Sequence, residues 1–361
     1  MRSDDALCHH RVRNLLEACD VRAGNQVVAE AALLRRFDGC LVDVDHDLFL
    51  YDTDNRSKLF VRNISSLIEQ YGSIQGVVPF YEDIFIGFAV NGLVKLSSSD
   101  GYEASEVDKN IPVTNTQNTN TFAVIIANEN YTSVASVPFA LNDGNIFQEY
   151  CKKTLGIPAK NIRYVPNATL NQIKAQVNWL QDVTKAYANA NIIFYYAGHG
   201  IPDESSRSSY LLPIDGTGTD VTTGYKLDNL YASLGAIPAK SVTVFMDACF
   251  SGSKRENGML ASARGVALVA KGGVPKGNMV VFSAAQGDET AYPNYDEKHG
   301  MFTYFLLKKL QETKGDVTLQ ELGSYITEKV SQESIVLNDK SQTPCVTASS
   351  SLDALWKTWK L

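Results

Sequence analysis

The sequence predicts an α/β protein with a doubly wound, mostly parallel sheet flanked by helices. Four continuous apolar runs of strand length follow residue 120, and segments with helical periodicity separate them. Such runs are typical of parallel strands covered on both faces, and the alternation of strand and helix predicts parallel crossovers. The 361 residues are 44% hydrophobic and 20% charged, a globular composition that can form a large core.

The expected strands and helices alternate along the second part of the chain. Thr169 with Gln172, and Thr318 with Glu321, have the spacing of a capping box, which marks the start of a helix. We expect strands at 121–128, 161–167, 191–196, 241–246 and 278–283. We expect helices at 142–154, from 169 onward, and at 226–234, 302–312 and 322–330.

The first 110 residues form a different region, which carries no recognisable catalytic motif. Residues 11–37 are expected to be helical, and 40–101 contain short alternating runs with turn residues, typical of a small β-rich or mixed unit. A polar Asn/Thr-rich segment then predicts a linker. We expect an N-terminal region at 1–110, a linker at 111–121, a main domain at 122–347 and a C-terminal tail at 348–361.

Composition argues against several classes of protein. The net charge is −7 and no long Lys/Arg run occurs, so nucleic acid is not an expected partner. The six cysteines are dispersed without a CxxC pair, which argues against a zinc site or a disulfide framework. No apolar run has the length of a membrane span or signal peptide, so we expect a cytoplasmic protein unless a leader precedes this sequence.

Two expected strands end in residues suited to nucleophilic catalysis. NIIFYY runs into AGHG, which contains His199, and SVTVFM runs into DACFSG, which contains Cys249. Ligands bind at the carboxyl ends of strands in open parallel sheets, so neighbouring strands would bring this thiol and imidazole to one crevice. A thiolate is a nucleophile, and an imidazole exchanges protons near neutral pH. The backbone N–H groups of Gly200 and Cys249 are candidates for holding an oxyanion.

Each residue also has an ordinary structural interpretation. A cysteine beside a strand is usually a small buried hydrophobe, and a histidine near a turn is usually structural. Here both stand at strand ends in loops of small residues, and Cys249 lies 50 positions after His199. This combination favours the catalytic interpretation.

These motifs resemble the caspase and metacaspase superfamily, especially its bacterial members, in which a His precedes the Cys by about 50 residues. Further similarities, in the same order over 121–347, are YLLPIDG at 210–216, SAAQGDETAY at 283–292 and GMFTYFLLKKL at 300–310. The resemblance implies a caspase-like fold and a thiol protease. Cys249 would be its nucleophile, His199 its general acid/base, and Ser283 a weak candidate for the substrate cleft. No cofactor would be required for the chemistry.

The residues around the nucleophile depart from caspases that cleave after Asp. Those carry QACRG and an Arg after the first strand, whereas this chain has Asp247 at the Gln position and offers Asp143 after the first strand. The resemblance to metacaspases implies that both aspartates form the floor of the specificity pocket. Carboxylates attract a guanidinium or ammonium and repel a substrate Asp, which predicts cleavage after Arg or Lys. Alternatively, Asp143 caps the following helix and Asp247 bonds to the catalytic loop.

Calcium dependence and self-processing are two further expectations. The positions matching a metacaspase calcium site are Ser208, Asp228, Asn229 and Glu256, and two expected carboxylates are replaced. Fewer charges weaken calcium binding, so we expect calcium activation not to be required. The loop at 251–277 is rich in Gly, Ser and basic residues, which suggests a zymogen that cuts itself there. Its candidate sites are Lys254, Arg255, Arg264 and Lys271, and an ordinary flexible loop is the alternative.

Two rival functions remain open at this stage. One is a catalytically idle caspase-like scaffold that binds partners through residues 1–110, although the intact Cys–His pair argues against it. The other is a caspase-like enzyme of different specificity. We expect a monomer acting on peptide or protein substrates, with His299 at the surface and with Trp356 and Trp359 packed against the domain.

Overall fold

The computed structural model describes six strands between residues 39 and 97, and then 104–187, 189–203, 205–250, 273–286, 289–338 and 340–361. The chain divides into two compact units, Met1–Glu103 and Ala104–Leu361.

The first unit contains two antiparallel three-stranded sheets among its described residues. One has the order β1-β2-β3 (Gly39–Val42, Asp47–Asp52, Ser57–Asn63) and the other β4-β5-β6 (Ile74–Phe80, Asp83–Phe88, Gly92–Ser97). This agrees with the expected β-rich unit. The expected helix at 11–37 lies outside the described residues.

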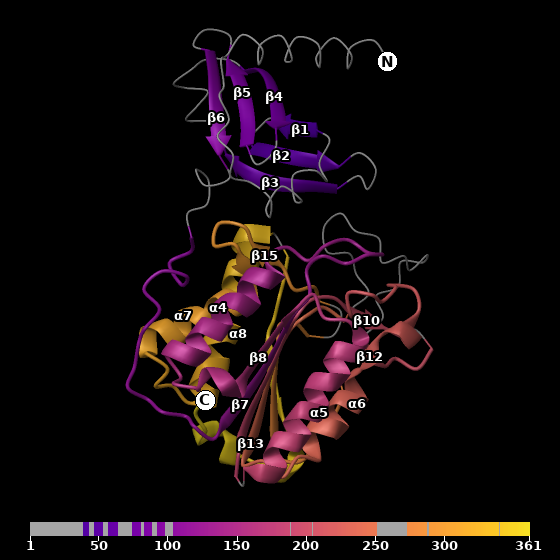
Figure 1. The fold of residues 1–361 in the computed structure, drawn as a ribbon, viewed down its shortest axis with the longest axis vertical. Coiled ribbons are helices and arrows are strands. Elements are labelled where there is room, and N and C mark those ends of the chain that lie inside the picture. The colour runs from indigo at the N-terminus through magenta and orange to yellow at the C-terminus, as the bar shows by residue number, and fades with distance from the viewer. Residues whose placement is uncertain are drawn as a thin grey trace. The chain divides into compact units, whose positions relative to one another are not determined.

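The second unit is built on a six-stranded sheet with the order β17-β14-β13-β9-β7-β8 (Figure 1). All neighbours pair in parallel except the edge strand β17, which is antiparallel to β14. In chain order the strands are β7 Thr121–Ala127, β8 Ile162–Pro166, β9 Asn191–Ala197, β13 Ser241–Asp247, β14 Met279–Ser283 and β17 Cys345–Ala348. The expected mostly parallel sheet is therefore confirmed.

Helices cover both faces of this sheet, as Figure 1 shows. One face packs against α4 (Ala140–Lys153), α7 (Met301–Thr313) and α8 (Leu319–Asn338), and the other against α5 (Leu170–Ala186) and α6 (Leu227–Gly235). In β9, Ile193 and Tyr195 belong to the core on the face covered by α4, α7 and α8. Ile192 and Phe194 belong to the core on the face covered by α5 and α6. Both faces of each strand are thus buried, which explains the continuous apolar runs.

Short elements complete the second unit. They are the strands β10 Gly200–Pro202, β11 Ser209–Leu211, β12 Tyr225–Lys226, β15 Pro293–Asn294 and β16 His299–Gly300. The 3-10 helices are Ala159–Asn161, Val221–Thr223, Ser350–Leu352 and Leu355–Thr358.

Both expected capping boxes are present. Thr169 accepts a hydrogen bond from the Gln172 N–H while the Gln172 side chain accepts one from the Thr169 N–H, and α5 begins at the next residue. Thr318 and Glu321 make the same exchange at the start of α8. That helix continues to Asn338, beyond the expected end at 330.

The segment expected to be a linker is hydrogen-bonded to the second unit. The Thr154 hydroxyl donates to the Pro112 carbonyl at 2.7 Å, and the Asn118 side chain donates to the Leu155 carbonyl at 2.7 Å. The second unit accordingly begins at Ala104 rather than near residue 110. At the other end, Trp356 and Trp359 pack against the core as expected. No helix among the described residues has the length and hydropathy needed to cross a membrane.

Gly144 provides a test of how closely α4 packs on the sheet. A Cβ at this position would lie 2.6 Å from the Ala127 Cβ and 2.9 Å from the Tyr164 ring. Gly→Ala inside a helix normally stabilises by about 1 kcal/mol. Here we expect Gly144→Ala to lower the free energy of unfolding by about 1–3 kcal/mol, because the added methyl pushes α4 away from β7 and β8. Urea denaturation measures this change in the free energy of unfolding.

The control is Asn145→Ala, at an exposed position on the same helix, which should be neutral or stabilising. A stabilised Gly144→Ala would contradict the packing argument.

Candidate active site

The register between β9 and β13 brings His199 and Cys249 to the same edge of the sheet. The strands pair in parallel with Ala197 opposite Asp247, and the Gly198 N–H donates to the Asp247 carbonyl at 3.1 Å. Each candidate lies two residues beyond this last pair. The loops that follow also touch, because a Cβ on Gly200 would lie 2.5 Å from the Cys249 carbonyl oxygen. Glycine at 200 is therefore needed for this close approach.

The His199 imidazole is held by the loop that follows β7. Its Nε2 lies 2.8 Å from the Ala135 carbonyl oxygen, and its backbone N–H donates to the Tyr131 hydroxyl at 2.8 Å. The Tyr131 ring also packs against the imidazole, with 4.8 Å between centroids. Since a carbonyl only accepts hydrogen bonds, Nε2 carries a proton, and in the neutral ring Nδ1 is the basic nitrogen. This loop thus sets the tautomer of the candidate base.

The Cys249 thiol lies against Ala291, a residue of the SAAQGDETAY motif. Cys249 is 8% exposed. Its sulfur accepts a hydrogen bond from the Ala291 N–H at 2.7 Å and lies 3.5 Å from the Ala291 carbonyl oxygen. Both polar groups of Ala291 therefore face the thiol, unlike the wholly apolar surroundings of a core cysteine.

Asp143 and Asp247 line one small cavity at this edge. Its volume is about 10 Å³, enough for about one water molecule. Its other lining residues are Val137, Pro138, Ala140, Ala197, Pro293 and Gly300. The structure thus brings together two carboxylates that lie 104 positions apart in the sequence.

The N-terminus of α7 donates hydrogen bonds to both carboxylates. The Gly300 N–H lies 3.2 and 3.1 Å from the two Asp143 carboxylate oxygens. The Asp247 Oδ2 accepts from the Thr303 hydroxyl at 2.7 Å and from the Thr303 N–H at 3.3 Å. Negative charge is favoured at a helix N-terminus. Asp143 also lies in the first turn of α4, where a carboxylate is favoured, so its contact with α7 adds to the helix-terminus role considered from the sequence.

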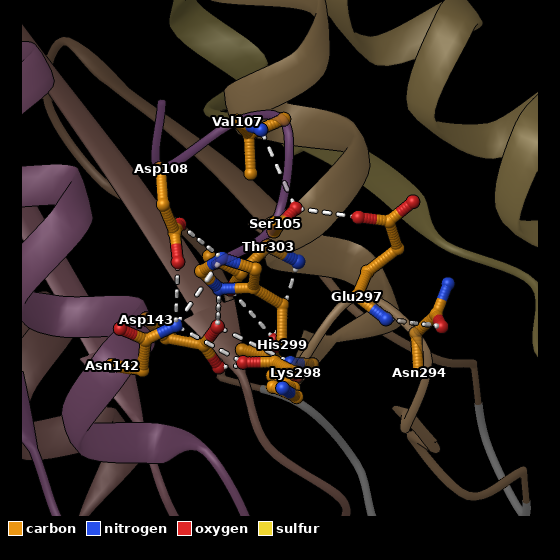
Figure 2. Close-up of polar contacts among 12 residues, drawn as sticks. Ser105, Val107, Asp108, Asn142, Asp143, Asn294, Glu297, Lys298, His299 and Thr303 are labelled. Atoms are coloured by element: carbon orange, nitrogen blue, oxygen red, sulfur yellow. Dashed lines mark hydrogen bonds and ion pairs between the residues drawn. The ribbon is translucent and has the colours of Figure 1, made fainter. Parts of the chain in front are cut away.

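His299, expected at the surface, is fully buried, and that expectation was wrong. Its Nδ1 lies 2.7 Å from Asp143 Oδ1 and its Nε2 lies 2.7 Å from Asp108 Oδ1 (Figure 2). The two carboxylates are 156 and 191 positions away in the chain, so no local pattern could indicate this contact.

Burial and charge shift the pKa values in this cluster. Burial raises the pKa of Asp143 to about 7, although hydrogen bonding to His299 opposes the rise, and the Asp247 charge adds to it. Burial alone would lower the pKa of His299. Hydrogen bonds to Asp108 and Asp143, together with their charges, outweigh this effect and raise the pKa to about 9.

The remaining candidates lie elsewhere or beyond the described residues. Ser283 ends β14 opposite Cys345, to which its side chain is hydrogen-bonded, and it is not among the residues lining the Asp143–Asp247 cavity. Asp228 and Asn229 are exposed at the start of α6, and Ser208 precedes β11. Outside the described residues lie Glu256, Lys254, Arg255, Arg264 and Lys271. No cluster of three or more His, Cys, Asp or Glu side chains suited to a metal ion occurs among the residues that the structure describes.

Sequence reasoning did not find several residues that support the site. Tyr131, Ala135 and Thr303 contact candidate residues, and Asp108 contacts His299, but only Thr303 lies within a quoted motif, GMFTYFLLKKL. The other three act through contacts made after the chain folds.

The comparisons with known proteins agree with this fold. A family model described as the caspase domain matches residues 120–355, so the chain belongs to the caspase-domain family of cysteine peptidases. The structure is similar to that of protein GSU0716 from Geobacter sulfurreducens, with a TM-score of 0.50 and 17% identity, over 66% of this chain and 97% of that chain. It is also similar to caspase-1 from Spodoptera frugiperda, with a TM-score of 0.46 and 18% identity, over 66% of this chain and 90% of that chain. No significant match occurs among curated proteins.

The different surroundings of two cysteines give a prediction about their reactivity. Cys151 is fully buried and burial raises the pKa of its thiol, whereas Cys249 is slightly exposed beside polar groups. We expect iodoacetamide to modify Cys249 at least about 10-fold faster than Cys151 in the native protein. Peptide mapping by mass spectrometry gives both rates. In urea the two rates should converge, and faster native modification of Cys151 would contradict this assignment.

Proposed function

We propose that this protein is a cysteine endopeptidase that cleaves peptide bonds after Arg or Lys. The observation that carries the proposal is the convergence of Asp143 and Asp247 on one cavity, at the sheet edge that also holds Cys249 and His199. A partly buried cation requires anionic partners, and two carboxylates at one site provide them.

The chemical step follows from the nucleophile and the base. His199 takes the proton of the Cys249 thiol, and the thiolate attacks the carbonyl carbon of the basic residue, so a C–S bond forms and the C=O electron pair moves to oxygen. Backbone N–H groups of Gly200 and Cys249 are proposed to hold this oxyanion. Collapse breaks the C–N bond, and the leaving amine takes a proton from His199. Water then attacks the thioester, His199 accepts its proton, and the acid product and thiolate are released.

The position of Asp247 links recognition to this step. It lies two residues before Cys249 and ends the strand that carries the nucleophile. A basic side chain bound to Asp247 and Asp143 would therefore belong to the residue whose carbonyl meets the thiol. A substrate Asp in this position would meet like charges, which cost several kcal/mol.

The cavity is narrow in this structure, which supports the proposal of a zymogen. A volume of about 10 Å³ does not admit an Arg or Lys side chain, so the walls must separate before substrate enters. Pro293 forms one wall and follows Ala291, which is hydrogen-bonded to the Cys249 sulfur. Opening this wall would also change the contact with the thiol. The proposed self-cleavage at 251–277 is a candidate trigger.

A panel of fluorogenic peptides tests the proposed activity. The peptides differ only at the residue before the reporter, which is Arg, Lys, Asp or Ala. We expect turnover of Arg and Lys at least about 10²-fold above that of Asp. Cys249→Ala and His199→Ala should each reduce it by at least about 10³-fold. Activity should persist in chelator, because calcium is not expected to be required.

Two results of this panel would contradict the proposal. Equal turnover of Arg and Asp would indicate a different specificity. No turnover of any peptide, with no labelling of Cys249 by a peptidyl-Arg electrophile before or after loop cleavage, would favour the idle scaffold.

Asp247→Asn tests the pocket separately from the nucleophile. The substitution removes one negative charge and retains the shape, so kcat/KM for Arg peptides should fall by about 10²-fold. Alkylation of Cys249 by a small uncharged reagent should change little. Asp182→Asn, at an exposed carboxylate on α5, is the control and should have no effect. Unchanged Arg cleavage in Asp247→Asn would contradict the pocket assignment.

Gly300→Ala blocks the same pocket by its volume. Gly300 has a φ of −60°, which any residue can adopt, so glycine is required here for space rather than for conformation. An added Cβ would collide with Asp247 Oδ2 and lie 3.0 Å from Asp143 Oδ2. We expect a loss of Arg and Lys cleavage of at least about 10²-fold, measured with the same peptides. Wild-type rates in this variant would place the basic side chain elsewhere.

A further inference from the structure

His299 connects three parts of the chain beneath the candidate pocket. It lies in β16, directly before α7, and its ring separates Asp108, from the segment preceding β7, from Asp143 in the first turn of α4 (Figure 2). The imidazole is fully buried and the Asp108 side chain is only 7% exposed. This contact therefore lies where water screens charge weakly.

The hydrogen-bond pattern defines the charge of this imidazole. Both ring nitrogens lie 2.7 Å from carboxylate oxygens, and an ionised carboxylate only accepts hydrogen bonds. When both carboxylates are ionised, both nitrogens donate and the ring is an imidazolium, which agrees with its raised pKa of about 9. The Asn142 side chain lies 3.3 Å from Nε2 and also donates to the Lys298 carbonyl at 3.1 Å. Asp247 is the third carboxylate of the cluster and acts on Asp143 through its charge.

The same contact orients the Asp143 carboxylate. Oδ1 bonds to His299, while both oxygens lie near the Gly300 N–H. A Cβ on Gly300 would meet both Asp143 Oδ2 and Asp247 Oδ2, so these two oxygens lie beside Gly300 in the cavity lining. Rotation of the Asp143 carboxylate away from the cavity would break its hydrogen bonds to His299 and to the Gly300 N–H at once.

We propose that His299 is a positioning residue of the basic specificity pocket: held by Asp108, it fixes the Asp143 carboxylate toward the cavity and keeps it anionic for a substrate guanidinium or ammonium. This inference rests on the proposed function and adds two residues to it. It also gives the segment before β7 a role in recognition, because that segment supplies Asp108.

The charge of Asp143 depends on this arrangement. Burial raises the pKa of Asp143 to about 7, and the His299 contact acts in the opposite direction. The carboxylate is therefore anionic above about pH 7 and becomes neutral as the pH falls through that value. Without the imidazolium, burial would act with less opposition, the pKa would rise further, and the pocket would lose a negative charge at neutral pH.

The experiment compares two pH profiles in the full-length protein. One is kcat/KM for an Arg peptide, which reports ionisations of the free enzyme, and the other is alkylation of Cys249 by iodoacetamide, which needs no pocket. The variants are His299→Gln and Asp108→Asn. The control is Glu297→Gln, which alters a neighbouring carboxylate bonded to Ser105 and Tyr304.

We expect the acidic limb of kcat/KM to move to higher pH by at least about one unit in His299→Gln. A smaller move in the same direction is expected in Asp108→Asn, because the imidazolium loses one of its two partners. The alkylation profile should not move in either variant, and Glu297→Gln should match the wild type. A defect confined to structure would instead lower both measurements without shifting the limb.

Each other outcome overturns the inference in an identifiable way. An unshifted acidic limb in both variants, with wild-type Arg turnover intact, contradicts the role of His299 and leaves the proposed function standing. Equal shifts in turnover and alkylation place the effect at the thiol instead. If His299→Gln does not fold, Asp108→Asn decides by the same criterion. Absence of Arg turnover in the wild type contradicts the proposed function itself, and this inference with it.

Discussion

Two carboxylates buried side by side determine how the carboxyl edge of this sheet is built. Asp143 and Asp247 are each 2% exposed, and burial of like charges is costly unless donors or cations compensate. The protein compensates with the N-terminus of α7 and with the His299 imidazolium. A buried cluster that contains two carboxylates in a small cavity is suited to receive a further cation, which is the physical basis of the proposed specificity.

The segments that form this cavity also hold the candidate catalytic residues. The loop after β7 contributes Val137 and Pro138 to the cavity wall, and it contacts His199 through the Ala135 carbonyl. The segment before β15 contacts Cys249 through Ala291 and continues to Pro293, which also lines the cavity. Filling the cavity therefore requires movement of chain segments that contact the thiol and the imidazole. Recognition and chemistry would be coupled through these shared walls.

The role of the segment before β7 follows from the same cluster. Val107 is fully buried and its carbonyl accepts a hydrogen bond from the Tyr150 hydroxyl at 2.9 Å, which anchors the segment to α4. Asp108 then reaches His299. Sequence composition predicts a domain that begins after residue 121, yet these contacts make residues 104–120 part of the second unit. A shorter fragment beginning at 122 would lack Asp108.

The sequence by itself determined the sheet, the alternation of helices and the edge that bears His199 and Cys249. These features depend on local patterns, namely apolar runs, capping boxes and glycine-rich strand ends, which the chain expresses over a few consecutive residues. Tertiary structure alone decided that His299 is buried between Asp108 and Asp143, that α7 supplies hydrogen bonds to both cavity carboxylates, and that the cavity is narrow. Those features arise from contacts between residues 56 to 191 positions apart, and their energies depend on burial and on charges that no local pattern records.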